Sequence, residues 1–183
     1  AGRHGREIIA QYLGEDADHA TLLAEKEVVY REMYGPHLAT VAGFDALTAS
    51  ARDNQVALVV GSAAPTENID FTLDGLDLRR RFDAIVGASD VERGKPHPDV
   101  FLKGARLAGA LPEHCIVFED APLGVEAARR AGMRAVVLTT TLPAAAFAEF
   151  DNIICIAPDF SQLDVEALFA SQPAAFAAGT PTT

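Results

Sequence analysis

The sequence lacks any apolar run near the roughly 20 residues that cross a bilayer, and Ala1 to Arg6 are polar and basic with no apolar signal region after them. Positively charged residues are also few relative to negatively charged ones. The chain has 15 lysine and arginine residues and 26 aspartate and glutamate residues, for a net charge of -11. The average field of such a chain repels phosphodiester backbones and anionic membranes. We therefore expect a soluble, cytoplasmic protein with neither a nucleic-acid nor a membrane partner.

Cysteine is scarce as well. The two cysteines, Cys115 and Cys155, each lie in a short apolar run typical of a buried strand, and neither belongs to a Cys-x-x-Cys pair. This placement favours reduced thiols over a disulfide. The 183 residues, 49% of them hydrophobic, suffice for one main core with a small appendage, which we expect as a monomer or a weak homodimer.

The apolar pattern of the chain alternates between helices and short strands. Strands separated by helices favour an α/β fold, a three-layer, doubly wound parallel sheet. We divide the chain into a partial helical cap at 1–36, an α/β core at 37–170, and a tail at 171–183 whose composition predicts disorder. The predicted helices are 5–14, 18–34, 44–52, 66–73, 98–108, 123–131 and 163–169, and the predicted strands are 56–60, 84–86, 115–118, 135–138 and 153–156.

Polar residues follow three of the predicted strands, at the end of an open parallel sheet where ligands gather. After the first, the hydroxyl of Ser62 and the backbone N–H groups behind it can form an anion site, although a helix cap also explains Ser62 and is favoured on this pattern alone. After the second, Lys95 lies between Gly94 and Pro96, at the amino end of a helix that Pro98 can start, and can reach an anion; the alternative is a solvated lysine. His97 is expected to be exposed and not catalytic.

The third strand runs directly into two adjacent carboxylates, Glu119 and Asp120, and then into a Pro-Leu-Gly turn. Two acids at a buried strand end repel each other unless a cation lies beside them. Their hard oxygen atoms suit Mg²⁺, which commonly accompanies phosphate chemistry. A helix cap accounts for Asp120 and leaves Glu119 unexplained, so the pattern favours a metal site.

Three stretches of the sequence together resemble a known family. They are Val-Val-Gly-Ser ending at Ser62, Gly-Lys-Pro-His-Pro-Asp-Val-Phe around Lys95, and Phe-Glu-Asp-Ala-Pro-Leu-Gly-Val-Glu-Ala-Ala around Glu119 and Asp120. They are similar to the second, third and fourth motifs of the haloacid dehalogenase superfamily, closest to its β-phosphoglucomutase-like branch. The resemblance extends over roughly residues 1–170, the scale of a single domain.

The resemblance implies a Mg²⁺-dependent phosphatase that acts on a small phosphorylated metabolite such as a sugar phosphate. It implies that Ser62 and Ala63 bind the transferring phosphoryl group and that Lys95 balances its charge. It also implies that Asp120 ligates Mg²⁺ with Glu119 beside it. A phosphomutase stays open as an alternative, and so does a non-catalytic chain that binds phosphate. A dehalogenase is disfavoured, because its chemistry needs no metal.

The family's first motif, a strand ending in Asp-x-Asp-Gly whose first aspartate is the nucleophile, is not found in the sequence. Asp16-Ala17-Asp18 lies between two helical segments, and Asp74-Gly75 follows a helix. Because the opening residues resemble the middle of the family's helical cap, we expect the nucleophile and the central first strand on an upstream segment. This chain alone is then expected to be incomplete and inactive, with unpaired edges on the neighbours of that strand.

Three residues near the start of the chain are further candidates. Arg3, His4 and Arg6 fall in the segment that resembles the cap, whose residues contact the substrate in this branch. The resemblance therefore implies sugar or phosphate contacts for them. Solvated charges at a helix end explain the same three residues equally well.

Overall fold

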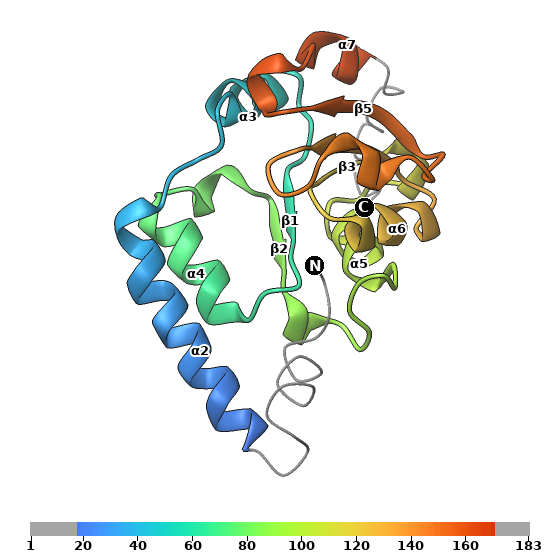
Figure 1. Cartoon of the computed structure of the whole chain (residues 1–183). Coiled ribbons are helices and arrows are strands. Elements are labelled where there is room, and N and C mark those ends of the chain that lie inside the picture. The colour runs from blue at the N-terminus through green and yellow to red at the C-terminus, as the bar shows by residue number, and fades with distance from the viewer. Residues whose placement is uncertain (1–17, 171–183) are drawn as a thin grey trace, which may run out of the picture.

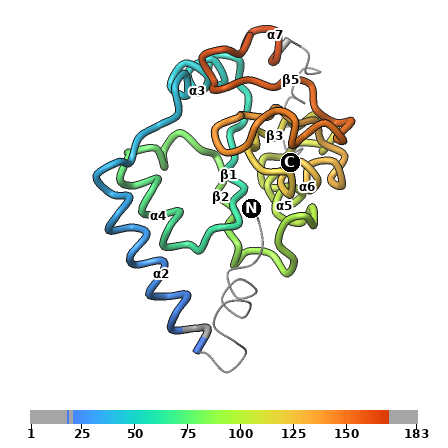
Figure 2. Tube along the Cα trace, viewed as in Figure 1, coloured from blue at the N-terminus to red at the C-terminus, as the bar shows by residue number. Residues whose placement is uncertain are grey.

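The computed structural model describes residues 18–170, in which parallel strands are flanked by helices (Figures 1 and 2). The strands are β1 (Val59–Gly61), β2 (Ala84–Val86), β3 (Ile116–Glu119), β4 (Arg134–Leu138) and β5 (Ile153–Ala157). The α-helices are α2 (His19–Tyr34), α3 (Phe44–Asp53), α4 (Thr66–Gly75), α5 (Asp99–Leu107), α6 (Pro122–Arg130) and α7 (Val165–Ala170). Helices and strands alternate along the chain from α3 to β4, which confirms the α/β fold class.

Within residues 18–170 the strands form two parallel sheets. β1 pairs with β2, and β4 lies between β3 and β5 in a separate sheet. No strand within residues 18–170 pairs with the second edge of β1 or of β3. The related expectation, that two strands would carry unpaired edges, is confirmed for these two strands.

The unpaired edge of β1 is accompanied by low burial. All three residues of β1 are only half-buried, whereas four of the five residues of β4, which has a neighbour on each side, are buried. Strands inside a doubly wound sheet are covered on both faces and flanked on both edges. In this structure β1 is an edge strand.

Two apolar clusters lie beside the two sheets. The larger packs α6 against β3 and β4, and its fully buried members include Val125, Val137 and Phe147. The smaller surrounds Ile69 and Leu73 of α4 and includes residues of β1 and β2. Helix α5 contacts β1, β2 and α6, so it joins the two halves of the core.

One strand starts later than predicted. The valine-rich run predicts a strand over 56–60, but β1 begins at Val59. The backbone N–H of Val56 donates to the carbonyl of Ala51 at 2.8 Å and closes the end of α3, so it is not available to a ladder. The N–H of Leu58 donates to the Asp83 carboxylate at 2.8 Å. These local hydrogen bonds keep the backbone N–H groups of Val56 and Leu58 from pairing with a neighbouring strand.

Several predictions concern residues outside the described part of the chain. These are the helix at 5–14, the tail at 171–183, and the candidates Arg3, His4 and Arg6. Among the helices that the structure describes, none is both long and apolar enough to pass through a membrane.

Gly43 is expected to tolerate no side chain. It precedes α3 with φ of +81°, and a Cβ there would lie 2.3 Å from the backbone nitrogen of Ser161. Gly43→Ala adds this clash to the cost of a left-handed backbone, so we expect it to lower the free energy of unfolding by about 3 kcal/mol in a denaturant titration. The matched control is Gly109→Ala, with φ of +66° and nothing within 4 Å, which should cost about 1 kcal/mol. Equal costs for the two variants would contradict the clash.

Candidate functional site

Lys95 connects the carboxyl ends of the two sheets. Its ammonium donates to the carbonyl of Gly61 at the end of β1, at 3.1 Å, and forms an ion pair with the Glu119 carboxylate at the end of β3. The Lys95 and Glu119 side chains are only 15% and 10% exposed. The alternative of a solvated surface lysine is therefore wrong, because Lys95 is a largely buried cation above the strand ends.

The loop that carries Lys95 is closed by an ion pair across its base. Arg93 donates from Nε and Nη2 to both carboxylate oxygens of Asp99, at 3.0 and 2.8 Å. These hydrogen bonds hold the pKa of the Asp99 carboxyl below its usual value. The Lys95 ammonium also lies 4.7 Å from the centre of the Phe101 ring, which attracts a cation to its face. The loop thus directs Lys95 inward, although lysine usually projects into solvent.

His97 belongs to the same loop. Its backbone N–H donates to the carbonyl of Gly94 at 3.0 Å, and the residue is half-buried. The prediction that His97 is exposed is therefore wrong. The cause is the turn closed by this hydrogen bond, which places His97 close to Gly94.

Ser62 follows β1 and lies beside the carbonyl that Lys95 contacts. Its backbone N–H donates to Val86 at 2.9 Å, and its hydroxyl oxygen accepts the N–H of Ala64 at 3.0 Å. The cap residue of α4 is Pro65, which makes no side-chain cap bond, so the helix-cap alternative for Ser62 is wrong. The Ser62 hydroxyl oxygen thus accepts a hydrogen bond within a tight turn, and its O–H can still donate to another acceptor. The neighbouring Ala63 is exposed.

Glu119 and Asp120 take different partners. Glu119 pairs with Lys95, whereas one Asp120 oxygen accepts a hydrogen bond from the hydroxyl of Thr141 in the loop after β4. The cation that relieves the repulsion between the two acids is thus at least partly Lys95. The cap residue of α6 is Ala121, without a side-chain cap bond, so Asp120 does not cap this helix. The other carboxylate oxygen of Asp120 suits a hard cation.

The two carboxylates alone would not complete a metal site. Residues 18–170 contain no group of three histidine, cysteine, aspartate or glutamate side chains that could hold a metal ion. Mg²⁺ usually keeps several waters and takes one or two protein carboxylates together with substrate phosphate oxygens. The donor chemistry of Asp120 and Glu119 therefore fits Mg²⁺, with further oxygen ligands from outside this pair.

Gly124 makes room for the Glu119 carboxylate at the start of α6. A Cβ on Gly124 would lie 2.0 Å from the carboxyl carbon of Glu119. Gly124→Ala should therefore push this carboxylate away from Lys95 without removing either charge, and we expect a loss of about 2 kcal/mol in unfolding free energy. In a Glu119→Ala background the same change should be neutral or stabilise by up to about 1 kcal/mol, because alanine favours a helix. The same loss in both backgrounds would contradict the steric account.

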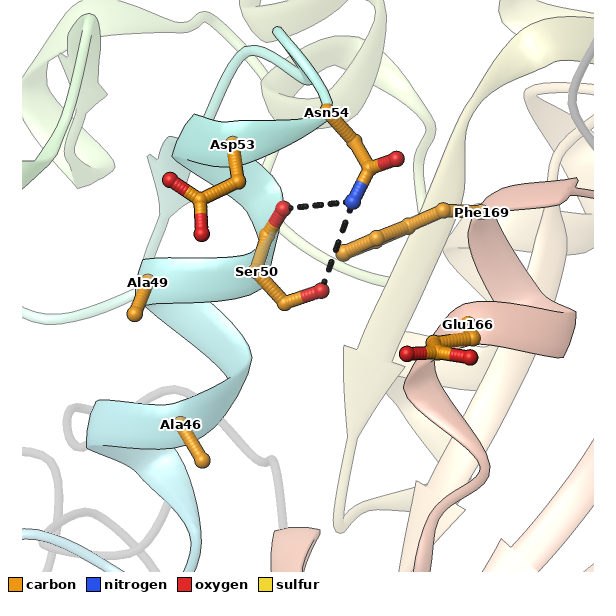
Figure 3. Close-up of a pocket in the computed structure, with 7 residues that line it drawn as sticks. All are labelled: Ala46, Ala49, Ser50, Asp53, Asn54, Glu166 and Phe169. Atoms are coloured by element: carbon orange, nitrogen blue, oxygen red, sulfur yellow. Dashed lines mark hydrogen bonds between the residues drawn. The ribbon is translucent and has the colours of Figure 1, made fainter.

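A broad groove lies elsewhere on the molecule. It has a volume of about 700 Å³ and opens between α3 and α7 (Figure 3). None of its lining residues belongs to the loops after β1, β2 or β3. The strand-end residues carry the candidate chemistry, so we place the candidate site there and not in this groove. The groove is lined by Ala46, Ala49, Ser50, Asp53, Asn54, Glu166 and Phe169.

The structure brings together four of the residues singled out from the sequence: Ser62, Lys95, Glu119 and Asp120. Lys95 contacts both Gly61, which precedes Ser62, and Glu119, which precedes Asp120. Sequence reasoning missed the contributions of Arg93, Asp99 and Thr141. The first two stand six positions apart around the Gly-Lys-Pro loop, a spacing that suggests a closing ion pair. Thr141 lies 21 positions from Asp120 and carries no local signal.

Relatives with assigned activities include phosphatases. The chain is 34% identical over 155 residues to validoxylamine A 7'-phosphate phosphatase of Streptomyces hygroscopicus subsp. limoneus, with 84% of this chain and 73% of that protein covered. It is 46% identical over 79 residues to fructose-1-phosphate phosphatase of Escherichia coli, with 43% and 42% covered. The match thus spans less than half the length of the second relative.

Solved structures share the fold. A haloacid dehalogenase hydrolase of family IA, variant 3, from Entamoeba histolytica superposes with a TM-score of 0.83 at 22% identity, covering 92% of this chain and 78% of that one. The β-phosphoglucomutase of Clostridium difficile superposes with a TM-score of 0.76 at 22% identity, covering 91% and 76%. The family model described as haloacid dehalogenase-like hydrolase matches residues 1–138. With this match over most of its length and the motif residues gathered at the strand ends, the chain belongs to the haloacid dehalogenase-like hydrolase family.

Proposed function

We propose that the full-length protein is a Mg²⁺-dependent phosphohydrolase that acts on a small phosphorylated metabolite, with a sugar phosphate as the leading substrate class. The observation that carries this proposal is the position of Lys95, a largely buried cation between the end of β1 and the Glu119 carboxylate, beside Ser62. The phosphatase names of the two relatives support the reaction class.

The donors at the strand ends suit a phosphoryl group. Lys95 has three N–H bonds, of which two point to Gly61 and Glu119, so one is left for a phosphate oxygen. The Ser62 hydroxyl can donate its proton while its oxygen keeps the Ala64 contact. In a loose phosphoryl-transfer transition state, fixed donors and cations around the equatorial oxygens supply most of the stabilisation.

Mg²⁺, when bound by Asp120 with Glu119 beside it, would neutralise further charge on the phosphoryl oxygens. The covalent step in this proposal belongs to an aspartate on an upstream segment. Its carboxylate oxygen attacks phosphorus, the ester oxygen leaves with a proton from a second aspartate, and water then cleaves the aspartyl phosphate.

Phosphate release from a panel of sugar phosphates, with Mg²⁺ or with a chelator, tests the proposal on the full-length protein. We expect release that requires Mg²⁺. Isomerised sugar phosphate in place of free phosphate would instead indicate a phosphomutase, in which a second sugar hydroxyl takes the place of water. Orthophosphate binding without turnover of any ester would indicate the non-catalytic alternative.

A further inference from the structure

Within residues 18–170, helix α2 is joined to α4 by hydrogen bonds between polar side chains. It runs alongside α4 (Figure 1), yet no residue from Thr21 to Tyr34 is buried. By comparison, α6 is nine residues long and buries four of them. Apolar burial therefore does little to hold α2 in place. Its large exposed apolar side chains are Val28 (45%), Val29 (50%), Tyr30 (41%), Met33 (72%) and Tyr34 (43%).

Asn68 of α4 forms the most specific contact between the two helices. Arg31 donates from Nη1 to the Asn68 carbonyl oxygen at 2.7 Å, and the Asn68 amide nitrogen donates to the Glu27 carboxylate at 2.5 Å. Asn68 is 8% exposed, and the Glu27 side chain is 17% exposed. The carbonyl oxygen of this buried amide thus accepts from a cation of α2, and its nitrogen donates to an anion of α2.

The charges within this group support one another. Glu27 and Arg31 are one helical turn apart in the order that favours an ion pair on a helix. Burial raises the pKa of Glu27, but hydrogen bonds from Lys26 and Asn68 and the nearby charges outweigh it, so the net pKa lies below its usual value. The carboxylate is therefore charged at neutral pH and accepts the amide.

We propose that Glu27, Arg31 and Asn68 form a polar clamp that fixes the orientation of α2 over α4 and can release without exposing an apolar core. A clamp of hydrogen bonds opens at lower cost than a packed apolar interface, so the helix can reorient as a unit about residues 35–43, which connect it to α3. Asn68 lies in the first turn of α4, directly after the Ser62 loop. This inference does not depend on the proposed phosphohydrolase activity.

Spin labels on α2 and α3 test the clamp. They are introduced by Glu25→Cys and Arg52→Cys, both at exposed positions, in a chain whose native cysteines are replaced by alanine. Asn68→Asp places a second carboxylate against Glu27. We expect the distance distribution between the labels to broaden by about twofold or to gain a second peak. Glu32→Gln, at an exposed acid on the same helix, should leave the distribution unchanged.

A rescue variant separates the clamp from a general loss of folding. In Glu27→Gln/Asn68→Asp the new carboxylate can accept from both Gln and Arg31, so the narrow distribution should return. Arg31→Met, at a half-buried position, removes the hydrogen bond to the Asn68 carbonyl oxygen. This single change should broaden the distance distribution between the labels. An unchanged distribution in Asn68→Asp, or a double variant as broad as the single one, would overturn the proposal.

Discussion

Lys95→Met is expected to lower the free energy of unfolding of this chain by about 3 kcal/mol, the largest loss from any single charge removal within residues 18–170. The physical reason is the Glu119 carboxylate, which is 10% exposed and would remain in place without its cation. A buried unpaired charge costs more than the pair contributed. Urea denaturation of the wild type and the variant at neutral pH measures the difference.

Two companion variants locate this effect at the ion pair. Lys103→Met removes a lysine whose ion pair with Asp90 is 28% and 43% exposed, and it should cost less than about 1 kcal/mol. Lys95→Met/Glu119→Gln removes both charges and should recover most of the stability lost in the single variant. If Lys95→Met costs no more than Lys103→Met, the buried ion pair is not an important part of the structure.

Asp120→Ala is expected to lower Mg²⁺-dependent phosphate release by the full-length protein at least about a thousandfold, equivalent to about 4 kcal/mol of transition-state stabilisation. The substitution removes the carboxylate that Thr141 orients at the end of β3. Steady-state assays over a range of Mg²⁺ concentrations measure the loss, and calorimetric titration of Mg²⁺ measures whether binding is lost with it.

The matched control for this variant lies at the other end of β3. Glu113→Gln changes an exposed acid in the turn before that strand, and it should leave phosphate release unchanged. Phosphate release that persists in Asp120→Ala, with the Mg²⁺ dependence of the wild type, would remove Asp120 from the proposed site.

The sequence predicts local features of the fold well, because their causes are local. The predicted helices at 98–108 and 123–131 are each followed by a glycine, and both, Gly109 and Gly132, have left-handed φ, +66° and +74°, just after α5 and α6. The strand at 84–86 was predicted at its observed limits. Apolar runs bounded by glycine and proline suffice for such predictions.

The contacts within the site were beyond sequence reasoning for a physical reason. Lys95 and Glu119 are 24 positions apart, and their pairing depends on how α5 packs against β1, β2 and α6. A lysine between glycine and proline gives no sign that a ring will lie beneath it, as Phe101 does. Placement of the residues at strand ends follows from topology, whereas the partners of each residue follow from packing.

The central claim is that phosphate and Mg²⁺ are held at the ends of β1, β2 and β3. Backbone amide chemical shifts of this chain, titrated with orthophosphate in the presence of Mg²⁺, test that location directly. We predict saturable shifts at Ser62, Ala63, Lys95 and Asp120, with none at the groove between α3 and α7. No shifts at these four amides, or shifts confined to the groove, would contradict the account.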